Sequence, residues 1–162
     1  MKTLLIYVSV SHANTKRIAK VMAGALGATL LEPEEVDVSI LSAYDLIGFG
    51  SGIYFTRYHN RLREFMKKLP VFQDKKAFLF ATSGMGEMSF GNFNFMGLFN
   101  RPLKKLLLKK GFDIIGIFFC TGHDTCFPFN LFGGVNKGRP DAGDFKKAEE
   151  FAENLKGRFQ IR

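Results

Sequence analysis

Hydroxyl and amide side chains gather near the start of the chain, in Ser9-Val10-Ser11-His12-Ala13-Asn14-Thr15. This stretch follows an apolar run and precedes residues with helical spacing, so it predicts a loop that ends at a helix N-terminus. Backbone N–H groups there lack partners within the helix and, with hydroxyls beside them, suit a phosphate. Ordinary capping by Asn14 or Thr15 is the alternative. The patterns GxGxxG and GxxxxGK(S/T) are absent, so dinucleotide-binding and P-loop motifs are not indicated.

A second group of reactive side chains lies at 120–126, where Cys120 and Cys126 flank His123 and Asp124. Thiol, imidazole and carboxylate groups are metal ligands, but no second cluster completes a tetrahedral site. A Cys–His nucleophile is the other chemical interpretation, although nothing in the sequence indicates an activated thiolate. We favour a loop that closes over a binding pocket, with Cys120 as the buried end of a strand.

The rest of the chain alternates between apolar runs and helical stripes. Five runs have the character of buried strands: 3–8, 28–31, 45–50, 76–81 and 112–119. Between and after them, apolar residues recur at three- and four-residue spacing over 18–26, 62–69, 103–107 and 145–155. Pro102 is expected near the start of the third helix and Gly111 just past its end. The Phe-, Gly- and Asn-rich stretch 84–100 is expected to be a loop.

This alternation predicts an α/β fold, a mostly parallel sheet with helices on both faces. The length of 162 residues and mass of 18.2 kDa fit a single domain, residues 1–162. In such a sheet ligands bind at the carboxyl ends of the strands, so the loops that leave those ends are the candidate sites. No apolar run approaches the ~18 residues of a membrane span. The two cysteines favour reduced thiols in the cytoplasm.

The formal net charge of +8 is unevenly distributed along the chain. Residues 21–56 carry −5, whereas residues 57–110 carry +9. A basic surface of this kind can steer an acidic partner, and solvated helix faces are the plainer alternative. Nucleic acid is not the expected partner, because the basic region lacks a recognition motif.

Four stretches, in chain order, together resemble the loops of the flavodoxin family. The first loop and the following Lys16-Arg17-Ile18-Ala19 are similar to its phosphate loop. Gly50-Ser51-Gly52-Ile53-Tyr54-Phe55 and Thr82-Ser83-Gly84 resemble the loops after its third and fourth strands. Gly138-Arg139-Pro140-Asp141 resembles the start of its last helix. The resemblance implies a flavodoxin-like three-layer fold, a five-stranded parallel sheet of order 2-1-3-4-5, and FMN as the cofactor.

Carried over to this chain, the first loop would hold the FMN phosphate, and the second would place Tyr54 or Phe55 against the flavin ring. Flavodoxins are typically acidic and often stack a tryptophan on the ring, whereas this chain is basic and has no tryptophan. Phe90 and Phe93 are the further aromatic candidates. The residues assigned to FMN by resemblance are Ser9, Ser11, His12, Ala13, Asn14, Thr15, Ser51, Gly52, Ile53, Tyr54, Phe55, Thr82, Ser83, Gly84, Met85, Gly86, Gly122 and Asp124.

The resemblance implies an FMN-binding electron-transfer protein as the leading function. An NAD(P)H- or quinone-dependent FMN oxidoreductase is the alternative, and a flavodoxin-like fold that binds without flavin is a third class. The expected partners are acidic redox proteins, with a small-molecule electron donor or acceptor left open and no membrane partner. The bases of residues 57–110 are expected to favour the reduced flavin as well as to attract that partner.

Overall fold

The computed structural model describes the chain except residues 85–88, 91–92, 126–128 and 161–162. Five parallel strands form its central sheet: β1 (Thr3–Val8), β2 (Thr29–Leu31), β3 (Leu46–Tyr54), β5 (Lys75–Ser83) and β8 (Phe112–Thr121). Their order across the sheet is β2-β1-β3-β5-β8. Numbered by chain position among the parallel strands, this is 2-1-3-4-5, so the flavodoxin-like fold is confirmed.

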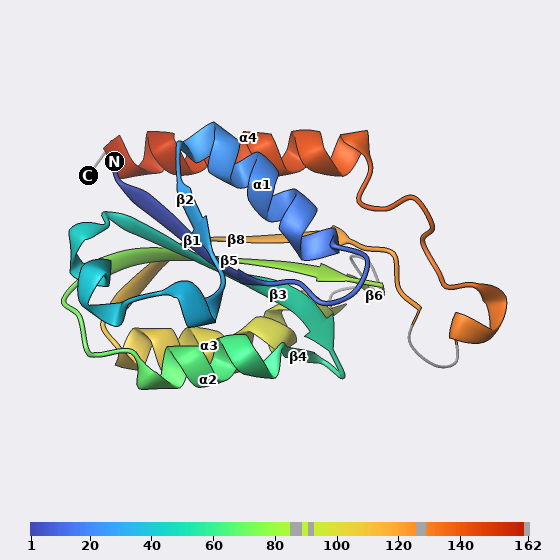
Figure 1. Ribbon diagram of the computed structural model, residues 1–162, viewed down its shortest axis with the longest axis horizontal. Helices are drawn as coiled ribbons and strands as arrows, with labels where there is room; N and C mark the ends of the chain where they lie inside the picture. Colours follow the sequence, from blue (N-terminus) through green and yellow to red (C-terminus); the bar gives the residue numbers. More distant parts are fainter. Residues whose placement is uncertain (85–88, 91–92, 126–128, 161–162) are drawn as a thin grey trace.

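Helices cover both faces of the sheet (Figure 1). Helices α1 (Asn14–Leu26) and α4 (Ala142–Gln160) lie side by side on one face, and α2 (Asn60–Lys68) and α3 (Phe95–Lys109) lie on the other. Short 3-10 helices, η1 (Pro33–Glu35), η2 (Val38–Ala43) and η3 (Phe129–Phe132), lie in the connections. None of the helices described is long and apolar enough to cross a bilayer.

Both faces of the sheet are buried, which explains why its strands read as continuous apolar runs. Leu4 and Ile6 of β1 point into the core beneath α2 and α3, while Leu5 and Tyr7 point into the core beneath α1 and α4. This alternation follows from the two-residue period of a strand.

The structure corrects two expectations from the sequence. The stretch 84–100 is not a loop throughout, because it contains a small hairpin, β6 (Ser89–Phe90) and β7 (Phe93–Asn94), and the first turns of α3. Pro102 therefore lies inside α3 and does not mark its start. The proline removes one helical hydrogen bond, but buried Leu103 and Leu107 anchor the helix to the core. The Tyr58 hydroxyl, also buried, donates to Asn100 Oδ1 at 2.5 Å.

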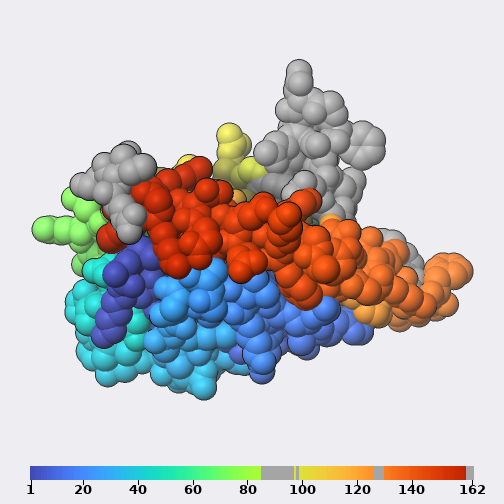
Figure 2. Space-filling view, turned by 90° about the horizontal axis from the view of Figure 1, so that it is seen from above, coloured from blue at the N-terminus to red at the C-terminus, as the bar shows by residue number. Residues whose placement is uncertain are grey.

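The third strand is also longer than expected. β3 continues to Tyr54 and turns back as the two-residue antiparallel strand β4 (Arg57–Tyr58). This β3–β4 hairpin and the segment 129–141 after β8 lie at the same end of the molecule (Figure 1). In the space-filling view the segment 129–141, in orange, projects from that end (Figure 2). That end carries the carboxyl ends of the parallel strands, where the candidate site residues lie.

Candidate functional site

Side-chain hydrogen bonds join the loops after β1, β5 and β8 at the carboxyl edge of the sheet. The hydroxyls of Thr15 and Thr82 are 2.8 Å apart and both are buried, so they join the first turn of α1 to the end of β5. Asn14 Nδ2 donates to the carbonyl of His123 at 2.7 Å, which joins the same turn to the loop after β8. Residues that are far apart in sequence thus meet where the sequence predicted one site.

The loops after β5 and β8 are also tied to each other. The amide of Gly122 donates to the carbonyl of Ser83 at 3.0 Å, and Asn136 Nδ2 donates to the carbonyl of Gly84 at 2.5 Å. A Cβ atom built on Gly84 would lie 2.2 Å from Asp124 Cβ. Gly84 is therefore required by the close approach of Asp124 itself.

The first loop enters α1 through two residues with left-handed backbone. His12 and Ala13 both have φ of 53°, and Ala13 precedes α1 without a side-chain hydrogen bond to the helix. Left-handed residues beside a helix start form a concavity of N–H groups that suits anions. The first turn contains no acidic residue, so the positive end of the helix dipole is not neutralised there. Ser9 Oγ accepts a hydrogen bond from the amide of Lys16 at 3.2 Å, and Ser11 is exposed.

Two imidazole rings meet beside this loop. The rings of His12 and His123 have centroids 4.1 Å apart, and a hydrogen bond of 2.9 Å joins His12 Nε2 to Thr125 Oγ1. Among the described residues, His123 Nε2 and Asn14 Oδ1 are buried polar atoms without a hydrogen-bond partner. Buried polar atoms are rarely left unpaired, and a bound ligand or ordered water is the usual partner.

The loop expected after β3 is partly strand. Ser51 is fully buried, and its hydroxyl donates to the carbonyl of Gly52 at 2.7 Å and accepts from the amide of His59 at 2.9 Å. Ser51 thus fixes the base of the β3–β4 hairpin. Half-buried Ile53 pairs across that hairpin with Tyr58, whose hydroxyl has a pKa raised by burial.

The two predicted aromatic residues of this hairpin differ in their surroundings. Tyr54 is half-buried, contacts the ring of His59 edge-on at 5.3 Å, and covers Gly52. Phe55 is 95% exposed at the tip of the turn. Only Tyr54 therefore has a ring orientation that this chain itself fixes.

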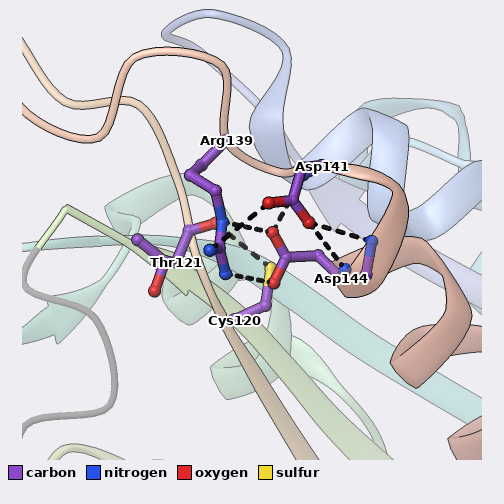
Figure 3. A network of polar contacts seen from close by, with 6 residues as sticks. Cys120, Thr121, Arg139, Asp141 and Asp144 are labelled. Carbon is purple, nitrogen blue, oxygen red and sulfur yellow. Dashed lines mark hydrogen bonds and ion pairs between the residues drawn. The ribbon is translucent and has the colours of Figure 1, made fainter.

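Figure 3 shows a polar network at the start of α4, to which the sequence analysis does not assign a role. The guanidinium of Arg139 donates to both carboxylate oxygens of buried Asp144, at 2.6 and 2.5 Å. This hydrogen bonding raises the pKa of Arg139, while the backbone amide of Asp144 lowers the pKa of Asp141. The carbonyl of Arg139 accepts from the amide of His123 at 3.2 Å, so the network positions the loop after β8. Cys120 faces it as the buried end of β8, as predicted.

Sequence reasoning also missed Asn136 and His59. Asn136 has a φ of 56° and lies between Gly134 and Gly138, a composition typical of a turn, but this local pattern does not indicate its contact with Gly84. His59 caps α2, where its Nδ1 accepts from the amide of Arg61 at 3.2 Å. Its burial and the charge of Arg61 lower the pKa of His59.

Some predicted residues are not placed. Met85, Gly86 and Cys126 lie outside the described residues. Within the described part of the chain, His, Cys, Asp and Glu side chains do not gather in threes as a metal site would require.

Comparison with known proteins shows the family to which the chain is related. A model of the flavodoxin domain matches residues 4–112. An uncharacterized protein of Methanocaldococcus jannaschii is 43% identical over 155 residues, which cover 96% of this chain and 98% of that protein.

Solved structures with the same fold include a flavodoxin from the domain Archaea and flavodoxin 2 from Bacillus cereus. The archaeal flavodoxin has a TM-score of 0.68 at 14% identity, over 99% of both chains. The Bacillus flavodoxin has a TM-score of 0.68 at 20% identity, over 98% of this chain and 99% of its own. Rubredoxin oxygen:oxidoreductase from Desulfovibrio gigas matches 99% of this chain with only 36% of its own length, at 16% identity and a TM-score of 0.66. At these identities the likeness establishes the shared fold.

Proposed function

This chain belongs to the flavodoxin family, and on that premise we propose that it binds FMN at the carboxyl edge of the sheet and transfers electrons. The observation that carries the proposal is the junction of the first, third and fourth loops around the start of α1. Thr15 is hydrogen-bonded to Thr82 there and Asn14 to His123, beside a helix start whose first turn has no acidic residue.

The residues present fit the phosphate of FMN. The left-handed pair His12–Ala13 and the start of α1, whose N-cap residue Ala13 offers no side-chain cap, would supply N–H donors. Lys16 and Arg17 add positive charge in the first turn. The unpaired atoms Asn14 Oδ1 and His123 Nε2 further support a site that a ligand completes. A dianionic phosphate would be favoured at such a position over a neutral group.

The flavin ring would extend from this phosphate toward Tyr54 and Gly84. Tyr54 is the better stacking candidate, because its ring is already held against Gly52 and His59 and loses little freedom on binding. When bound, FMN supplies the redox chemistry, since none of the protein side chains needs to carry electrons. The chain binds the phosphate, orients the ring and limits access of water.

We propose a carrier of electrons between proteins in the cytoplasm. The cytoplasmic location is supported by the sparing use of cysteine, with Cys120 buried in β8.

The test is the absorbance spectrum of the purified protein, followed by chromatography of the cofactor released on denaturation. We expect a yellow protein that releases FMN in a ratio near one to one. A colourless protein that does not take up added FMN would contradict the proposal. If the protein oxidises NADH or NADPH without a separate reductase, it is an oxidoreductase and the proposed carrier role is wrong.

A further inference from the structure

The tip of the β3–β4 hairpin holds an aromatic side chain that the fold itself does not use. Phe55 is the most exposed of the large apolar side chains that the structure describes, at 95%. Phe55 and Thr56 have φ of 46° and 66°, a left-handed conformation that disfavours bulky and β-branched residues. Strain of this kind persists mainly at functional sites. A large ring held in water by a strained turn points to a contact outside this chain.

A shallow hollow beside Phe55 is positively charged. It is lined by residues 54–60 and Arg63, and none of these lining residues is acidic. Within the described ranges, neither Arg57 nor Arg63 forms an ion pair. Neighbouring Arg61 differs, because its guanidinium is bound by Glu32 at 2.8 Å and Glu34 at 2.5 Å. The two arginines of the hollow are therefore available to an external anion.

Further exposed apolar side chains lie at the same edge of the sheet. Val10 follows β1 and is 60% exposed, while Leu131 and Phe132 of η3 follow β8 and are 67% and 83% exposed. The segment containing η3 and the hairpin tip both project at this end of the molecule (Figure 1). With Phe55, they make up a set of exposed apolar side chains at the carboxyl edge of the sheet, where the candidate flavin site lies, and this set is called the rim below.

We propose that this rim and the arginine-lined hollow dock the acidic face of a protein redox partner. The inference rests on the proposed function, because the rim lies at the edge of the sheet where the flavin would exchange electrons. A protein is favoured over a small ligand, since small ligands are mostly enclosed by their sites and this hollow is open. Aromatic and arginine side chains dominate the binding energy of protein interfaces. The +8 charge of the chain would steer an acidic partner toward it.

The experiment measures binding of a plant-type ferredoxin, an acidic electron carrier, by NMR shift mapping and titration at low and high salt. We expect the amide shifts to concentrate on residues 54–63 and 130–132, and the affinity to fall steeply with salt. F55A and the double variant R57Q/R63Q should each weaken binding about tenfold, the scale of an interface hot spot. Two control variants should change the affinity for ferredoxin less than about twofold. V71A removes another exposed apolar side chain, and K104Q/K105Q removes the same amount of charge.

Other results overturn the inference. Amide shifts centred on α3, or a loss of affinity in K104Q/K105Q as large as that in R57Q/R63Q, would place the interface elsewhere. Undetectable ferredoxin binding would also contradict the inference, as would binding through the hairpin to phosphatidylglycerol vesicles in place of ferredoxin. Flavin is not needed for this measurement, so the two proposals can fail separately. Docking by a protein that takes up no FMN would count against the proposed function alone. Bound FMN without docking at the hairpin would count against the interface alone.

Discussion

At the scale of single residues, Thr15 links the fold to the candidate site. Its hydroxyl is buried and bonded to that of Thr82 at 2.8 Å, at the first turn of α1. Thr15→Ala should weaken FMN binding by about 1–2 kcal/mol while changing riboflavin binding much less, because the hydroxyl orients the phosphate-binding turn. Calorimetric titration with both ligands measures this, and Thr15→Ser is the control that keeps the hydroxyl. Equal weakening of both ligands would show that the turn does not hold phosphate.

Tyr54 and Phe55 are adjacent residues with different expected roles. Tyr54→Ala should brighten flavin fluorescence and weaken flavin binding by about 1–3 kcal/mol, taking the scale of aromatic stacking on nucleic-acid bases. Phe55→Ala should leave both nearly unchanged, because Phe55 extends into solvent. Fluorescence titration of the two variants compares them directly. If Phe55→Ala changes fluorescence and binding while Tyr54→Ala does not, Phe55 is the residue that stacks on the flavin. If neither variant has an effect, Phe90 and Phe93 become the candidates.

At the scale of elements, the start of α2 makes stability depend on pH through His59. Burial and the charge of Arg61 lower its pKa from the ordinary value of 6.5, so the unfolded chain binds this proton more readily than the folded one. The contribution of His59 to stability is therefore complete above the unfolded pKa and is lost as the pH falls toward the folded value.

Urea unfolding between pH 7.5 and 5.5 measures this dependence. The wild-type free energy of unfolding should fall with pH more steeply than that of His59→Asn, which keeps an acceptor at the helix start but does not titrate. Identical pH dependences would mean that the capping nitrogen of His59 does not couple protonation to folding.

The elements differ in how far they could be predicted from the sequence. β1 and α1 were predictable because a continuous apolar run and a helical stripe are strong local signals. The start of α3 was not, because Pro102 is a local signal that the burial of Leu103 and Leu107 outweighs. The β3–β4 hairpin was missed because Phe55-Thr56 lacks the glycine and asparagine typical of such turns.

In the candidate site, too, the sequence predicted individual residues but not the contacts between them. Asn14 and Thr15 were predicted from their place in the first loop, but their partners His123 and Thr82 depend on how the strands align. The contact of Asn136 with Gly84 spans 52 residues and has no counterpart in local sequence. Local sequence pattern and family resemblance thus predicted which loops form the candidate site. The contacts between those loops could be identified only from the packed structure.

At the scale of the whole molecule, the basic charge is divided between two ends. Lys109 and Lys110 lie beside the start of β8, whereas the candidate site lies at its end, about 20–30 Å away for a ten-residue strand. The expectation that bases of residues 57–110 favour the reduced flavin therefore does not extend to these two lysines. Over two or more Debye lengths at 0.1 M salt, those lysines have little influence on it.

A potentiometric titration tests this division. Changing Lys104, Lys105, Lys109 and Lys110 to Gln should shift the flavin midpoint potentials by less than about 10 mV at 0.1 M salt, because the charges are distant and screened. Lys16→Gln, a change in the first turn of α1, is the positive control and should shift them more. A large shift in the fourfold variant would mean that the flavin lies nearer α3 than the first loop allows.

The central claim is that the start of α1 holds the phosphate of FMN, and amide chemical shifts report on it most directly. The protein freed of any flavin is titrated with FMN and, separately, with riboflavin, which lacks the phosphate. We predict that both ligands shift the amides of Tyr54 and Gly84, while only FMN shifts those of residues 11–16. Equal shifts of residues 11–16 with both ligands, or no shift there with FMN, would contradict the account.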